Sequence, residues 1–130
     1  MATCQEHEQA WRHNRKFLTT IQKEFTDWKL TVAFYTALHV VDWLLVTEGN
    51  GCIGHTARNG LLKANRYSKI WRHYQPLFNA SLVSRYKSAP NQFDSAKAEA
   101  FINNNLLECE KSVFRLLKRD EPVERIAWMP

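Results

Sequence analysis

Three polar side chains interrupt the most apolar stretch of the sequence, the run from Trp28 to Val46. They are Tyr35, His39 and Asp42, which stand at positions i, i+4 and i+7 and so share one face of a helix. A buried polar stripe costs free energy unless its groups are paired, because it loses its hydrogen bonds to water. We expect the stripe to face polar residues from later in the chain, namely His55, Arg58, Arg85 and Tyr86.

Two interpretations of this polar group are open. In the first, it is a structural network that fixes how the helices pack. In the second, it lines a pocket for a phosphate-bearing small molecule, with Arg58 and Arg85 as charge-assisted hydrogen-bond donors.

A second group of candidate residues consists of two Cys-x-x-His motifs, Cys4 to His7 and Cys52 to His55. In an antiparallel bundle the start of the first helix lies near the end of the second, so a Cys₂His₂ zinc site is geometrically feasible. Cys4 lies near a terminus, where chains usually fray, and two short matches are weak evidence. We therefore predict no bound metal and no cofactor.

The positive charge of the chain is concentrated in one segment. The net charge is +5, and residues 49–90 contain no Asp or Glu. The cations of this segment are Arg58, Lys63, Arg66, Lys69, Arg72, Arg85 and Lys87, and the aromatic residues between them are Tyr67, Trp71, Tyr74 and Tyr86. Cations contact phosphates and aromatic rings stack on unpaired bases, so the pattern favours single-stranded RNA as a partner. The alternative is that the aromatic rings belong to the core and the cations only keep one face soluble.

The elements that must position these residues are helices. Apolar spacing and capping residues predict helices over 4–23, 28–46, 56–64 and 68–86, and from Asp94 or Ser95 to Lys118. The expected N-caps are Thr26 or Asp27 for the second helix, Thr56 for the third and Ser68 for the fourth. Pro76 should kink or divide the fourth helix, and Ser88 to Asn91 should end it. The resulting fold is all-α, an antiparallel up-and-down bundle of four main helices plus a short extra helix.

Length and composition limit the remaining choices. The 130 residues form one domain, 1–130, whose tail at 120–130 is docked on the bundle or loosely ordered. The three cysteines have no disulfide-framework spacing, and no signal peptide precedes the first amphipathic segment, which indicates the cytoplasm. The 28–46 run nearly reaches membrane-spanning length, but it contains Lys29, His39 and Asp42, so we expect no membrane span.

The stretches AFYTALHVVDWLLVTEG, GHTARNGLL and SRY together resemble the HEPN-type helical domains of prokaryotes. The resemblance covers about residues 28–88. It implies an up-and-down α-bundle, frequent dimerisation, and a role around nucleotides or RNA. It also implies a kinship to metal-independent ribonuclease toxins, which are paired with nucleotidyltransferase partner proteins.

The ribonuclease members of that family carry an Arg, four to six intervening residues and then a His. Arg66 and His73 satisfy this spacing, although Tyr67 stands where a polar residue is common. In such an enzyme His73 would act as general base or acid during attack of an RNA 2′-hydroxyl on the adjacent phosphate, and Arg66 would stabilise the charged phosphorane. If the helix begins only after Ser68, however, Arg66 lies outside it and the two side chains need not face the same way.

The leading hypothesis is a HEPN-like binding module, a homodimer with a basic face for RNA or a phosphate-bearing nucleotide. The alternatives are a ribonuclease that uses Arg66 and His73, and a structural domain whose basic face meets an acidic protein.

Overall fold

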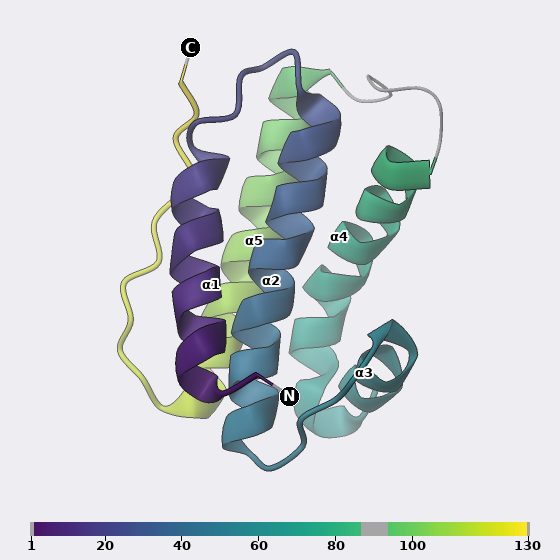
Figure 1. Ribbon diagram of the computed structural model, residues 1–130, viewed down its shortest axis with the longest axis vertical. Helices are drawn as coiled ribbons and strands as arrows, with labels where there is room; N and C mark the ends of the chain where they lie inside the picture. Colours follow the sequence, from purple (N-terminus) through teal and green to yellow (C-terminus); the bar gives the residue numbers. More distant parts are fainter. Residues whose placement is uncertain (1, 87–93, 130) are drawn as a thin grey trace.

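The computed structural model describes residues 2–86 and 94–129, and of Tyr86 only the backbone. These residues form helices and no strand. The helices are α1 (Cys4–Leu18), α2 (Thr26–Thr47), α3 (His55–Leu62), the 3₁₀ turn η1 (Asn65–Tyr67), α4 (Ser68–Tyr86) and α5 (Ser95–Leu117). Figure 1 shows the four long helices running alternately up and down, with the short α3 beside the start of α4. The all-α bundle predicted from the sequence is confirmed.

Helix α2 lies at the centre of the bundle and packs against α1, α4 and α5 (Figure 1). Its apolar side chains are almost all buried, and Phe34, Val40 and Leu44 are fully covered. A helix that is apolar on every side must be surrounded by other helices, and α2 is. By length and composition alone it could also cross a membrane, but 78% of that apolar window is buried inside the bundle.

The first three helices begin or end differently from the sequence prediction. Helix α1 stops at Leu18 rather than residue 23. The cap position of α2 is Phe25, which supplies no side-chain hydrogen bond, so the prediction of Thr26 or Asp27 as N-cap was wrong. Thr26 is already helical, and its hydroxyl donates to the Lys23 carbonyl at 3.2 Å.

The short helix α3 spans 55–62 rather than 56–64, and its cap is Gly54 rather than Thr56. Gly54 has a φ of 88°, which glycine adopts without the penalty a side chain would bring. The chain geometry before α3 therefore decided the cap, because a Thr hydroxyl can act as N-cap only from the position that precedes the helix.

Helix α4 covers the predicted range 68–86, and Pro76 does not divide it. Tyr74 and Leu77, on either side of the proline, are both fully buried, and this packing holds the helix continuous despite the missing N–H. Ser68 is the first helical residue instead of a cap, because η1 leads directly into α4. The predicted break at 88–91 lies outside the described residues. Of the two residues expected to open α5, Asp94 is the N-cap and accepts from the Lys97 N–H at 2.9 Å.

The C-terminal tail is docked on the bundle. The side-chain amide of Asn103 in α5 binds both backbone groups of Ile126, at 2.7 Å from the N–H and 3.2 Å from the carbonyl, and Ile126 is 4% exposed. The ring of Trp128 lies 5.2 Å from the Lys29 ammonium. The tail therefore closes the side of the bundle between α1 and α5, along which it runs in Figure 1.

Candidate functional site

Asp42 and Arg58 form a buried ion pair that joins α2 to α3. Arg58 donates from Nε to Asp42 Oδ1 at 2.7 Å and from Nη2 to Oδ2 at 2.8 Å, and both side chains are 6% exposed. Burial alone would lower the pKa of Arg58, but the hydrogen bonds to Asp42 outweigh it and raise the pKa. Arg58 Nη1 also lies 3.4 Å from the Gly54 carbonyl and from His55 Nδ1, so the pair fixes the start of α3.

Two further groups surround this pair. The Tyr74 hydroxyl is buried without a hydrogen-bond partner among the described residues, and burial raises its pKa. His55 packs against the rings of Phe34 at 5.8 Å and Phe78 at 5.4 Å. Burial, and then the positive charge of Arg58, lower the pKa of His55 and so favour the neutral form of its ring.

Tyr35 is engaged by α4. Arg85 Nη1 donates to the Tyr35 hydroxyl at 2.9 Å, and Arg85 Nε donates to the Ser81 carbonyl at 3.3 Å. The Arg85 guanidinium also lies 5.5 Å from the centre of the Tyr35 ring. These contacts tie α2 to α4, just as Arg58 ties α2 to α3.

His39, the third member of the stripe, pairs with a residue that the sequence did not suggest. Its Nδ1 lies 3.1 Å from Nδ1 of His7 in α1, and His7 is 7% exposed. One of these nitrogens must donate and the other accept, so the pair tolerates only one additional proton without breaking the bond. Burial, and then the neighbouring His7, lower the pKa of His39.

The polar stripe is therefore divided among three helices, with one partner each in α1, α3 and α4. This arrangement favours the structural interpretation of Tyr35, His39 and Asp42 over a nucleotide pocket. Arg58, which a pocket would need as a phosphate donor, is 5% exposed, and its guanidinium contacts Asp42, the Gly54 carbonyl and His55. The remaining predicted member, Tyr86, has a side chain outside the described part of the chain.

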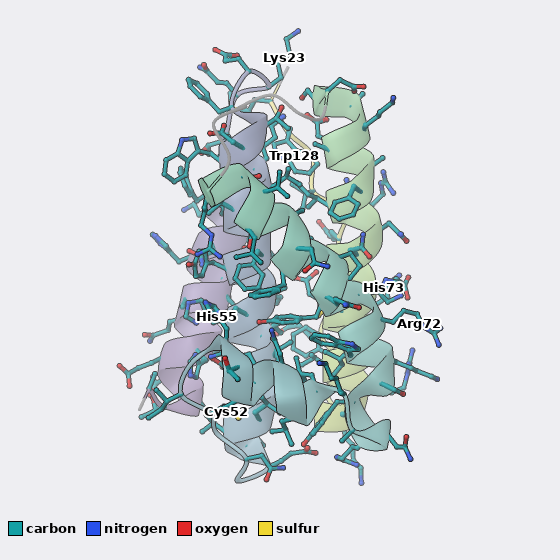
Figure 2. The ribbon with its side chains drawn as sticks, turned by 90° about the vertical axis from the view of Figure 1, so that its right-hand side faces the viewer. Lys23, Cys52, His55, Arg72, His73 and Trp128 are labelled. Carbon is teal, nitrogen blue, oxygen red and sulfur yellow. The ribbon has the colours of Figure 1, made fainter. Side chains whose placement is uncertain are left out.

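Arg66 and His73 are engaged by different neighbours. Arg66 lies in η1, where its guanidinium forms an ion pair with Glu48 at the end of α2 and lowers the pKa of that carboxyl. His73 lies more than one turn into α4, with Nδ1 3.1 Å from the side-chain oxygen of Asn105 in α5. Figure 2 places His73 beside Arg72 at one edge of the molecule, on the opposite side of the view from His55. The structure shows no direct contact between the proposed catalytic side chains.

The two Cys-x-x-His motifs do not form one centre. The Cys4 thiol lies 3.3 Å from the Thr47 hydroxyl, and the Cys52 thiol 3.3 Å from the Asn50 carbonyl. Their histidines have other partners. His7 Nδ1 lies 3.1 Å from His39 Nδ1, and His55 Nδ1 lies 3.4 Å from Arg58 Nη1. Across the described ranges 2–86 and 94–129, no three His, Cys, Asp or Glu side chains gather as metal ligands.

The cations of the basic segment separate into two groups. Arg58 and Arg85 point inward, and Lys87 lies outside the described residues. The others are exposed on the end of α3, η1 and the start of α4, and we call them the α4 basic surface: Lys63, Arg66, Lys69 and Arg72.

Of the aromatic residues predicted to stack on bases, Tyr67 and Tyr74 are core residues, 2% and 0% exposed. Trp71 is half-buried, and the Lys63 ammonium lies 5.4 Å from its ring centre. Tyr67 also lies beside this surface, with its ring centre 5.9 Å from the Arg66 guanidinium, but that ring is covered. Trp71 is therefore the described aromatic of that set that is partly exposed at the α4 basic surface.

Helix α5 adds residues to this surface that the sequence reasoning missed. Arg115 and Ser112 line a hollow together with Arg66 and Lys69. The four-residue spacing of Lys111 and Arg115 was a signal for a basic face on α5. It could not reveal that this face lies beside η1, because only packing sets how two helices are rotated against each other.

Searches of protein-family models, of curated proteins and of solved structures find no match to this chain.

Proposed function

We propose that the protein is a binding module for single-stranded RNA, which it contacts through the α4 basic surface. The observation that carries the proposal is the clustering of Lys63, Arg66, Lys69 and Arg72, all exposed, on three consecutive elements whose segment contains no acidic residue. Phosphate contacts by such cations release counterions and supply most of the affinity of non-specific nucleic-acid binding.

Trp71 supports a single strand over a duplex. An indole at the edge of a cationic surface can stack on an unpaired base, which contributes about 1–3 kcal/mol per base. A duplex presents no free base face. Trp71 is half-buried and its ring is already flanked by Lys63, so it is held in place before RNA arrives.

The test is RNA binding measured by fluorescence anisotropy at several salt concentrations. We expect a single-stranded oligonucleotide to bind more tightly than the matching duplex, with an affinity that falls steeply as salt is added. Replacing Lys69 and Arg72 with Gln should weaken binding and reduce the slope of log K against log salt by about 1.4, since each phosphate contact contributes about 0.7.

The matched control removes the same charge elsewhere. Lys16 and Lys23 are exposed on α1 and on the connection that follows it, and Figure 2 shows Lys23 at the far end of the molecule from Arg72. A Lys16→Gln, Lys23→Gln variant should bind RNA like the original protein. Equal weakening in both variants would mean that net charge, rather than this surface, attracts the RNA.

The same samples address the ribonuclease alternative. If Arg66 and His73 form an active site, the RNA is shortened even with a chelator present, and His73→Ala abolishes the shortening. Intact RNA after prolonged incubation leaves binding as the activity.

The proposed relationship to HEPN-like domains extends this function to a cytoplasmic homodimer with a nucleotidyltransferase as partner protein. The helical bundle supports the relationship at the level of fold only. A gene for a small nucleotidyltransferase next to the gene for this chain would strengthen it.

The proposed homodimer uses an apolar patch at the α1–α2 end of the bundle. Phe17, Phe25 and Trp28 are 49%, 46% and 57% exposed there, and they line one hollow of about 600 Å³. The patch offers both a protruding Trp28 and a cavity beside it, as a two-fold interface requires, because each copy must supply both halves of the contact. Residues 1–27 carry four basic and four acidic side chains, so two copies meet there without net repulsion.

A further inference from the structure

A hollow of about 240 Å³ lies between the start of α4 and the last turns of α5. Its wall combines side chains from three elements, and the ones that can donate hydrogen bonds are Asn65 and Arg66 from η1, Ser68 and Lys69 from α4, and Ser112 and Arg115 from α5. No acidic side chain lines it. The hollow is therefore a concave part of the α4 basic surface, in which cations converge from different directions.

The donors of this hollow are mostly unused. Lys69 and Arg115 form no ion pair with any described residue, whereas Arg66 is bound to Glu48. Ser112 is 8% exposed, and its hydroxyl has no hydrogen-bond partner within residues 2–86 and 94–129. The unpaired hydroxyl of a side chain that is more than nine-tenths buried, at the wall of a cationic hollow, is a donor available to a ligand.

Charge and size both restrict the ligand. Three cations less the Glu48 carboxylate leave two positive charges, which match the charge of about −1.5 to −2 of a phosphate monoester at neutral pH. A phosphodiester carries only one. The volume of 240 Å³ is smaller than the roughly 300–1,000 Å³ of pockets that enclose a whole small molecule. The hollow therefore suits a phosphate group whose attached body remains outside, on the surface towards Arg72.

We propose that this hollow binds a terminal phosphate monoester. This inference rests on the proposed RNA-binding function, in which the monoester is the phosphorylated end of an RNA strand and the rest of the strand continues along the exposed edge of α4. This assigns Lys69, Ser112 and Arg115 as the residues that distinguish a phosphorylated end from a hydroxyl end. Arg66 closes the hollow from the side of η1, where Glu48 fixes its position.

The experiment compares oligonucleotides of one sequence that end in a 5′-phosphate, a 3′-phosphate or only hydroxyl groups. We expect one phosphorylated form to bind about tenfold or more tightly than the hydroxyl form, because hydrogen bonds to a charged group are the strong ones. Arg115→Gln and Ser112→Ala should each reduce this preference, because the phosphorylated form loses more affinity than the hydroxyl form. Lys111→Gln is the matched control, since Lys111 is exposed one turn away on α5 and does not line the hollow.

The outcomes separate this inference from the function it rests on. If all three oligonucleotides bind equally, the phosphate site is refuted and RNA binding stands. If no RNA binds, the proposed function fails. Whether the hollow binds a phosphate monoester is then tested by comparing the melting temperature with adenosine 5′-monophosphate and with adenosine. Stabilisation by the monophosphate that is lost in Arg115→Gln but kept in Lys111→Gln would place a free nucleotide there. No stabilisation would overturn the inference as well.

Discussion

Breaking the Asp42–Arg58 pair should destabilise the fold more than removing any surface charge. In Asp42→Asn the guanidinium of Arg58 keeps its positive charge inside a protein environment in which it is 5% exposed. An isolated charge at such a position costs several kcal/mol, because the water that would solvate it is absent. We expect the free energy of unfolding to fall by about 3–5 kcal/mol, a large part of the roughly 5–15 kcal/mol typical of a domain.

The complementary change, Arg58→Met, should have a similar effect for two reasons. It leaves the carboxylate of Asp42 unpaired, and it removes the contacts of Arg58 with the Gly54 carbonyl and His55 that fix the start of α3. In the double variant Asp42→Leu, Arg58→Met, no charge remains buried. We expect its loss to be about 2 kcal/mol or less, well below the sum of the single changes, since apolar side chains of similar volume often replace a buried ion pair at little cost.

The assay is urea unfolding followed by the helical circular dichroism signal, with the dependence on urea checked to be the same in all variants. Lys111→Gln is the reference, because Lys111 and Glu108 form an exposed pair at 3.9 Å that should contribute less than about 1 kcal/mol. If Asp42→Asn costs no more than Lys111→Gln, the pair is not buried as described. Asp42 and Arg58 would then again be candidates for a ligand pocket.

Three further predictions concern pH, the tail and the oligomeric state. Burial lowers the pKa of His39 below 6.5, so the unfolded chain binds a proton at this residue more tightly than the folded protein does. The free energy of unfolding should therefore fall as the pH drops below about 6.5, and it should fall less in His39→Gln. Urea unfolding at pH 7.5, 6.5 and 5.5 measures the difference. Ile126→Ala should lower the unfolding free energy by about 2–4 kcal/mol in urea, whereas Met129→Ala, at a site 62% exposed, should leave it nearly unchanged. Trp28→Ser should convert the proposed dimer to a monomer in sedimentation experiments without lowering the melting temperature, and a monomeric original protein would contradict the dimer.

Much of the fold follows from local patterns in the sequence. The order and type of the helices were predictable, because apolar spacing and helix-breaking residues act within a few positions of the chain. Asp94 was one of two residues expected to open α5, and Asp42 was expected in one polar group with Arg58, because a buried polar stripe needs polar partners. Thr26 and Thr56 failed as caps because the path of the connecting chain, which the sequence does not reveal, set where each helix began.

The candidate site depended on tertiary structure to a greater extent. The sequence by itself determined that residues 49–90 carry an uncompensated positive charge and that α2 carries one polar stripe. It could not determine that Arg58 turns inward while Lys69 stays exposed, because both are cations on predicted helices and only packing decides which face is buried. It also could not bring Ser112 and Arg115 beside Lys69, more than 40 positions earlier in the chain. Contacts between distant segments arise from the rotation and offset of packed helices, and these are properties of the whole core.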